Sequence, residues 1–197
     1  MEAAKKELIL EAAVRAFARH GFKKASVDDI ARDAGVAKGT VYLACENKED
    51  LFFQAVHREL RAWIGEISKL IDPRVPADEL LGITAMAAFT YLESHPLVKD
   101  LFSGIFHGQL PGWANRFDEL RAMGNTNVQE ILKLGVRQGK FRKNLDVEET
   151  ANILQDLNLI SHVLMHSRSG GVTAEYVQRR FTAAMDLVLL GIKPRSK

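Results

Sequence analysis

Residues 26–51 read SVDDIARDAGVAKGTVYLACENKEDL, and this stretch is the most informative part of the chain about its structure. Ser26 followed three residues later by Asp29 is typical of a helix N-cap, and Gly35 suits the tight turn that ends such a helix. A second apolar pattern follows the glycine directly. Two short helices are therefore predicted, over residues 27–34 and 37–44.

Two helices joined by a tight turn can present the second helix to the major groove of DNA. In that helix, Lys38 can reach a phosphate or a guanine, and Gly39 lets the backbone approach DNA closely. The hydroxyl groups of Thr40 and Tyr42 can bond to phosphate oxygens. Lys48 adds a positive charge at the N-terminus of the next helix, where the helix dipole already favours an anion. The stretch therefore indicates a helix-turn-helix that binds DNA.

The composition is that of an ordinary soluble globular protein, with 47% hydrophobic and 26% charged residues. No apolar run approaches the ~20 residues that span a bilayer, and acidic residues interrupt the N-terminus, which argues against a signal peptide. Cys45 is the only cysteine, so no internal disulfide can form and a cytoplasmic location is expected. The formal net charge is only +2, so the case for DNA must rest on where the charges lie.

The whole chain reads as helical, which predicts an all-α fold. A first helix is expected over residues 5–20, closed by Gly21, and a long helix is expected from the N-cap Asn47 to about Ile71. The segment 124–127, Gly-Asn-Thr-Asn, could kink or split the helix that contains it. The further helices, which bring the total to about nine, are expected over residues 78–94, 97–107, 112–139, 147–167 and 174–190.

Over about residues 8–56 the chain resembles the TetR family of bacterial repressors, through ILEAAVRAFARHGF, SVDDIARDAGVAKGTVY and NKEDLF. The later stretch GVRQGKFRKNLDVEETANIL resembles the family's segment before its penultimate helix. The resemblance implies a homodimer with a three-helix DNA-binding domain at residues 1–48 and a helical ligand-binding and dimerisation domain at residues 49–197. It also implies repression that a small molecule relieves. The candidate DNA-contacting residues are Ser26, Ala37, Lys38, Gly39, Thr40, Tyr42 and Lys48.

The chain departs from the family's pattern at two places. Ala37 stands where the family usually has Ser or Thr, which removes a cap worth ~1 kcal/mol and a possible phosphate contact. After Tyr42 the family usually has an aromatic pair that ends in Phe, whereas this chain has Leu43, Ala44 and Cys45. Cys45 is expected to replace a core phenylalanine. The resemblance therefore implies DNA binding but no particular base preference.

The last two expected helices, 147–167 and 174–190, carry apolar residues on more than one face. One face can pack on the chain's own core, and the other then needs a second copy of the chain. The alternative is burial of both helices within a monomer. The DNA-binding hypothesis favours the homodimer, because a single helix-turn-helix contacts only a few base pairs.

Large apolar residues are frequent in the C-terminal domain, where the resemblance implies a ligand pocket. They favour a hydrophobic or aromatic ligand, although aromatic residues at helical spacing are also typical of a plain core. Polar residues in the apolar stretch 158–162 are either ligand contacts or lie at the solvent edge or dimer seam. The candidate ligand-binding residues are Trp63, Ile67, Phe89, Phe102, Phe106, Trp113, Phe117, Asn158 and His162.

No catalytic residue, cofactor or metal is expected, because the chain lacks a phosphate-binding glycine loop, a GxSxG elbow and an HExxH motif. His162 and His166 have the spacing of two metal ligands, but no third ligand accompanies them. The sequence thus favours a repressor that binds a palindromic operator and leaves it when a ligand moves the helix 47–71 as a lever. The alternatives are a helical small-molecule-binding protein and an enzyme without a DNA role.

Overall fold

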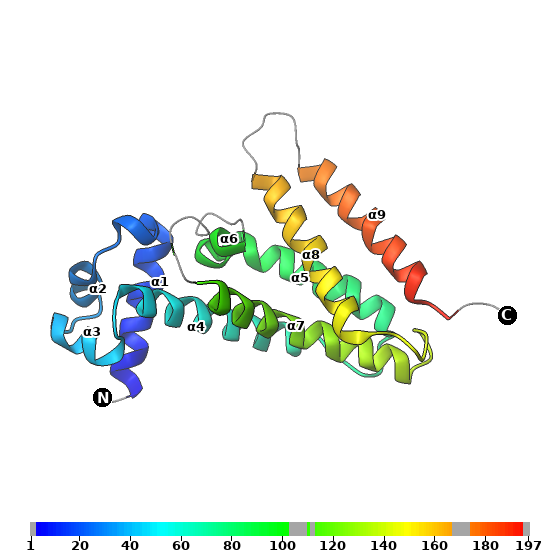
Figure 1. Cartoon of the computed structure of the whole chain (residues 1–197), viewed down its shortest axis with the longest axis horizontal. Helices are drawn as coiled ribbons and strands as arrows, with labels where there is room; N and C mark the ends of the chain where they lie inside the picture. The colour runs from blue at the N-terminus through cyan, green and yellow to red at the C-terminus, as the bar shows by residue number, and fades with distance from the viewer. Residues whose placement is uncertain (1–2, 103–109, 111–112, 167–173, 195–197) are drawn as a thin grey trace. The chain divides into compact units, whose positions relative to one another are not determined.

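The computed structural model describes residues 3–102, 110, 113–166 and 174–194, and these residues form helices connected by turns, with no strand among them (Figure 1). The all-α prediction is therefore confirmed. None of the helices in this part of the chain is both long and apolar enough to cross a membrane. In order along the chain the helices are α1 (Ala3–Lys24), α2 (Val27–Asp33), α3 (Lys38–Ala44), α4 (Lys48–Ser68), α5 (Ala77–Ser94), α6 (Pro96–Phe102), α7 (Ala114–Arg137), α8 (Val147–His166) and α9 (Ala174–Ile192).

The chain divides into two compact units. The first combines residues 1–62 with residues 93–120, and the second combines residues 63–92 with residues 121–197. The long helices α4, α5 and α7 contribute residues to both units. The boundary expected after residue 48 separates the residues expected to bind DNA from the rest of the chain. The division into compact units does not test that boundary, so it stays a prediction.

Local chemistry sets the helix ends of the first unit. Gly21 and Gly35 have φ angles of 70° and 67°, which L residues with a side chain rarely adopt. Gly21 therefore ends the main run of α1 at a kink, beyond which only a short piece to Lys24 follows, and Gly35 lies just after the end of α2. Ser26 caps α2, because its hydroxyl oxygen accepts a hydrogen bond of 3.1 Å from the backbone N–H of Asp29. Asn47 caps α4 in the same way through the N–H of Asp50, at 2.7 Å. These four expectations are confirmed.

An aromatic cluster forms the centre of the first unit. The ring centroid of Phe52 lies 5.0 Å from that of Phe17 and 5.3 Å from that of Trp113, and Phe17 and Phe52 are fully buried. Helix α1 contacts α2, α3 and α6. Arg58 of α4 also binds α1, through the carboxylates of Glu7 (2.5 Å) and Glu11 (3.0 Å). These contacts give α2 and α3 a packed base.

The second unit has its own apolar core, in which α8 and α9 lie side by side. Gln138 fixes the loop before α5, since its Nε2 donates to the carbonyls of Pro73 and Val75 and its Oε1 accepts from the N–H of Ala77. The buried core residues are Ala77, Leu80, Leu81, Ile131, Leu132, Leu134, Phe141, Leu145, Ala151, Leu154, Met185 and Ile192.

Helix α7 runs without interruption through residues 124–127, so the split that the glycine and asparagines suggested does not occur. Two buried asparagines explain the continuity. Asn125 hydrogen-bonds to Asn152, and the Nδ2 of Asn127 donates to the carbonyl of Ile64 at 2.9 Å. Their side chains are used in tertiary contacts, so they do not compete for the helix's own backbone.

Candidate nucleic-acid interface

Helix α3 has one buried face and one exposed face. Val41 is fully buried and Cys45 is 5% exposed, so these two residues anchor the helix to the core. Residues four positions apart lie on the same face of a helix. On the side of α3 opposite the two buried residues, the exposed residues therefore form two adjacent rows. A single exposed helix face of this kind fits the major groove of DNA. The exposed residues of this face are Lys38, Gly39, Tyr42 and Leu43.

The start of α3 is open to approach. Ala37 occupies the N-cap position with φ −69° and ψ 147° and makes no side-chain cap, as the sequence predicted. A Cβ atom placed on Gly39 would meet nothing within 4 Å, so the backbone here is uncovered. Thr40 is half-buried, and its N–H donates to the carbonyl of Ala37 at 2.8 Å. The first turn of α3 can therefore come close to a nucleic-acid backbone.

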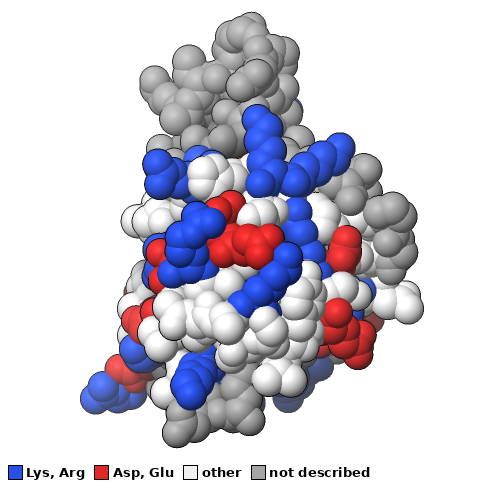
Figure 2. All heavy atoms as spheres, turned by 90° about the vertical axis from the view of Figure 1, so that its left-hand side faces the viewer, with Lys and Arg blue, Asp and Glu red and all other residues white. Residues whose placement is uncertain are grey.

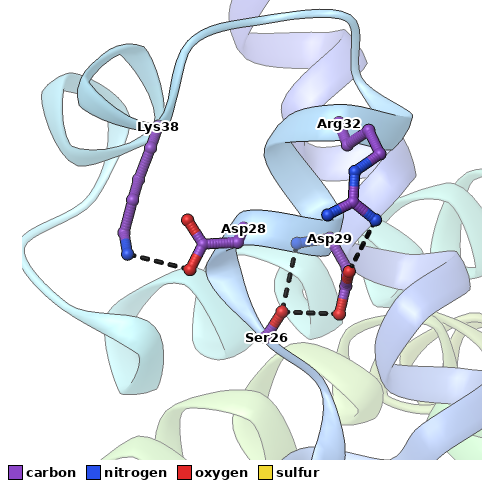
Figure 3. A network of polar contacts seen from close by, with 5 residues as sticks. All are labelled: Ser26, Asp28, Asp29, Arg32 and Lys38. Atoms are coloured by element: carbon purple, nitrogen blue, oxygen red, sulfur yellow. Dashed lines mark hydrogen bonds and ion pairs between the residues drawn. The ribbon is translucent and has the colours of Figure 1, made fainter.

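An ion-pair network joins α3 to α2 (Figure 3). The ammonium of Lys38 reaches across to the carboxylate of Asp28 at 2.9 Å, and this hydrogen bond raises the pKa of Lys38. On α2, Ser26 donates to Asp29 at 2.6 Å, and this hydrogen bond lowers the pKa of Asp29. Arg32 pairs with the same carboxylate at 3.0 Å. Lys38 and Arg32 are thus both paired with carboxylates of α2.

The surface around this network carries charges of both signs. Figure 2 faces the side of the first unit that carries α2 and α3, and it shows Lys and Arg side chains on either side of a central acidic group. Up to Lys48 the chain has nine basic and seven acidic residues. The surface as a whole therefore attracts phosphates only weakly, and Lys38 can bind a phosphate only when it leaves Asp28.

We expect Asp28→Asn to strengthen DNA binding by about threefold to tenfold. An exposed ion pair contributes ~0.2–1 kcal/mol, and its removal frees Lys38 for a phosphate while it also removes a negative charge that repels DNA. Fluorescence anisotropy of a labelled duplex at fixed salt measures the change.

A matched control for this prediction is Asp33→Asn. Asp33 also pairs with an arginine of the same unit, Arg15, at 2.8 Å, and both side chains are more than half exposed. Equal strengthening by the two variants would mean that bulk charge, and not the release of Lys38, controls the affinity.

Lys48 lies against α1 in this structure. Its Nζ donates to the carbonyl of Lys23 at 3.2 Å and sits 4.8 Å from the ring centre of Phe22. Partial burial lowers the pKa of Lys48. Lys48 thus joins the start of α4 to the end of α1, and its phosphate contact stays a prediction.

Cys45 belongs to the packed side of α3, as expected for a residue that replaces a core phenylalanine. Its thiol donates to the carbonyl of Val41 at 3.3 Å, and burial raises its pKa to about 11. A thiol that stays protonated at neutral pH is a poor nucleophile. Cys45 therefore serves packing.

The candidate ligand-binding residues fall into three groups. Trp63 and the buried Ile67 belong to the second unit, where Trp63 stacks on Tyr91 with ring centroids 5.9 Å apart. Trp113 and Phe117 belong to the first unit, where their ring centroids lie 5.6 Å apart beside Phe52 and Phe53. The other candidates have side chains outside the described residues: Phe89, Phe102, Phe106, Asn158 and His162.

A buried polar layer between α7 and α8 was not predicted. Asn125 is 3% exposed, and its Nδ2 donates to the Oδ1 of Asn152 at 2.6 Å. The Nε2 of Gln155 donates to the carbonyl of Arg121 at 3.1 Å. The side-chain oxygens of Asn125 and Gln155 are buried and have no hydrogen-bond partner among the described residues. A buried acceptor of this kind costs ~1–3 kcal/mol unless a donor from elsewhere satisfies it.

In the described part of the chain, no three His, Cys, Asp or Glu side chains are grouped so that they could hold a metal ion. The side chains of His162 and His166 lie outside the described residues.

Comparison with known proteins shows that the chain is similar to transcriptional regulators. Residues 9–55 match the family described as bacterial regulatory proteins, tetR family. The HTH-type transcriptional repressor KstR2 of Mycolicibacterium smegmatis is 28% identical over 197 positions, which cover 96% of this chain and 91% of that protein. The fatty acid metabolism regulator protein of Bacillus subtilis is 29% identical over 141 positions, which cover 71% of this chain and 72% of that protein.

A solved structure has the same fold. The transcriptional regulator FadR of Bacillus subtilis, crystallised in complex with stearoyl-CoA, matches with a TM-score of 0.74. The match covers 94% of this chain and 98% of that chain at 21% identity. Both compact units of this chain thus have counterparts in a known regulator.

Proposed function

Because the chain belongs to the TetR family of transcriptional regulators, we propose that it is a repressor that binds a palindromic operator as a homodimer and leaves it on binding a hydrophobic small molecule. The observation that carries this proposal is the exposed face of α3, set on a buried base and preceded by the tight turn at Gly35. We infer a regulator and not an enzyme, acting in the cytoplasm, where the DNA of a bacterium lies.

The homodimer is supported by apolar residues that α8 and α9 leave exposed. Ile153 is 45% exposed, and Leu187 and Leu190 are 72% and 67% exposed. Helices α8 and α9 already contact each other, so a second copy of the pair could cover these residues and complete a four-helix seam. Sedimentation of the chain at its monomer mass of 22.0 kDa at micromolar concentration would refute the dimer.

The ligand is proposed to bind in the second unit. Its core is apolar, and the oxygens of Asn125 and Gln155 are acceptors that an N–H or O–H group of a ligand can satisfy. One relative is named as a fatty acid metabolism regulator, and the similar solved structure of FadR contains stearoyl-CoA. Long-chain acyl-CoA is therefore the first compound class to test. Helix α4, which supplies residues to both units, is the element we propose to carry the signal.

Lys38→Ala and Tyr42→Ala are each expected to weaken binding to all DNA sequences alike. Both residues lie on the exposed face of α3, where we propose that they contact the phosphate backbone, and a phosphate contact carries no sequence information. Because the homodimer presents two copies of Lys38, Lys38→Ala should also reduce the slope of log affinity against log salt by about 2. Anisotropy titrations at several salt concentrations give both quantities.

Lys69→Ala is the matched control for Lys38→Ala, because Lys69 is also exposed and paired with an acid, Glu66, but lies in the second unit. It should leave the affinity and the salt slope unchanged. An unchanged affinity in Lys38→Ala and Tyr42→Ala would remove these two residues from the proposed interface.

The proposal is tested by titrating the protein into the DNA upstream of its own gene, with and without stearoyl-CoA. We expect saturable binding that survives competition by random DNA and is reversed by the acyl-CoA. Binding of stearoyl-CoA without any DNA binding would favour the alternative, a helical small-molecule-binding protein. Specific DNA binding that stearoyl-CoA leaves unchanged would retain the repressor and exclude this ligand.

A further inference from the structure

Leu43 is the most exposed of the large hydrophobic side chains in the described part of the chain, at 79%. It lies on α3 directly beside Tyr42, which is 47% exposed. Single exposed apolar residues are common on protein surfaces. Leu43, however, lies on the face of α3 that is proposed to enter the major groove, where an exposed apolar side chain can contact a base.

The packing of α3 explains why Leu43 points away from the core. The buried positions Val41 and Cys45 lie two residues before and after it, which places Leu43 on the opposite side of the helix. One turn earlier on the same side stands Gly39, where a Cβ atom would meet nothing within 4 Å. Gly39 therefore has no side chain that could cover Leu43 from the preceding turn.

The chemistry of the major groove offers one apolar group to such a side chain. Base edges there present hydrogen-bond donors and acceptors, and only thymine adds a methyl group, on C5. Leucine has no polar atom in its side chain, so it cannot distinguish bases by hydrogen bonds. Lys38 and Tyr42, in contrast, carry groups that bond to phosphates or to guanine.

We propose that Leu43 reads thymine in each half of the operator by packing on the C5 methyl group. This inference rests on the proposed function, since it requires that α3 enters the groove. This contact would require a thymine at one position of each half-site, which the polar residues of α3 do not require. Burial of one methyl group corresponds to about a fourfold gain in affinity for each half-site.

The test replaces, one at a time, each thymine of an operator obtained by selection from random DNA with deoxyuridine. This substitution removes only the C5 methyl group and leaves base pairing intact. For the wild-type protein, we expect one position in each half-site where the loss of the methyl group weakens binding about fourfold. For Leu43→Ala, binding should be weaker to the thymine operator and insensitive to deoxyuridine at that position.

Two controls make the comparison specific. Leu8→Ala removes a leucine that is 50% exposed on α1, and it should keep the wild-type response to deoxyuridine. Leu43→Ala should unfold at the wild-type temperature, because the side chain makes little contact with the core. If Leu43→Ala binds too weakly for a titration, all proteins are compared at lower salt, which strengthens the phosphate contacts of each.

Equal sensitivity of the wild type and Leu43→Ala at every thymine would overturn the inference, as would a wild type that no deoxyuridine affects. In both cases specific binding of the operator would persist, and the proposed repressor function would stand. A failure of the selection to enrich any sequence would instead contradict the proposed function itself.

Discussion

Phe52→Ala is expected to lower the free energy of unfolding by about 3–5 kcal/mol, the range for removing a buried aromatic ring. Phe52 is fully buried, and its ring centroid lies within 5.4 Å of those of Phe17, Phe22 and Trp113. Its loss leaves a cavity at the centre of the first unit and removes three aromatic pairs at once. Since α1 contacts both α2 and α3, a loosened α1 also loosens the surface proposed to bind DNA.

Urea denaturation followed by tryptophan fluorescence measures this loss, because Trp113 lies in the cluster that the substitution opens. The matched variant is Phe52→Leu, which keeps most of the volume and should cost no more than about 1.5 kcal/mol. A loss below 1 kcal/mol in Phe52→Ala would show that the aromatic cluster is not what holds the first unit together.

Gly135→Ala is expected to destabilise the second unit by about 3 kcal/mol through overpacking. A Cβ atom at this position would lie 2.1 Å and 2.2 Å from two ring carbons of Phe141 and 3.0 Å from the Cβ of Ala77. The ring has little freedom to move, because Phe141 is 1% exposed and its own N–H donates to the carbonyl of Gly135 at 3.1 Å. The close approach of α7 to the following turn requires a residue without a side chain.

Gly82→Ala provides the opposite case in the same unit. Gly82 lies in α5, and a Cβ atom there would meet nothing within 4 Å. Alanine is the better helix former by about 1 kcal/mol, so this variant should be as stable as the wild type or more stable. Thermal unfolding compares the two variants, and equal melting temperatures would show that space at Gly135 is not limiting.

The parts of the fold that local chemistry determines could be predicted from the sequence. Ser26 and Asn47 cap helices because their side chains accept hydrogen bonds from N–H groups three residues ahead. Gly21 and Gly35 end helical runs because their φ angles are positive. These features depend on residues within one turn of each other, so the order of the helices and the helix-turn-helix follow from them.

Features that depend on distant parts of the chain could not be predicted in the same way. The pairing of Lys38 with Asp28 needs the packing of α3 on α2, and the contact of Trp113 with Phe52 joins residues far apart in sequence. The sequence predicted that α3 is the helix that contacts DNA. It did not identify Leu43 as its most exposed side chain, because exposure depends on which neighbours the fold places around it.

Selection of binding sites from random duplex DNA can show whether this chain binds DNA through α3 as a symmetric dimer. We expect enrichment of an inverted repeat whose half-sites are centred about 10 base pairs apart, or a multiple of that spacing, so that two copies of α3 meet the major groove on the same side of the duplex. Enrichment of no sequence, or of a motif without two-fold symmetry, would contradict binding by a symmetric dimer.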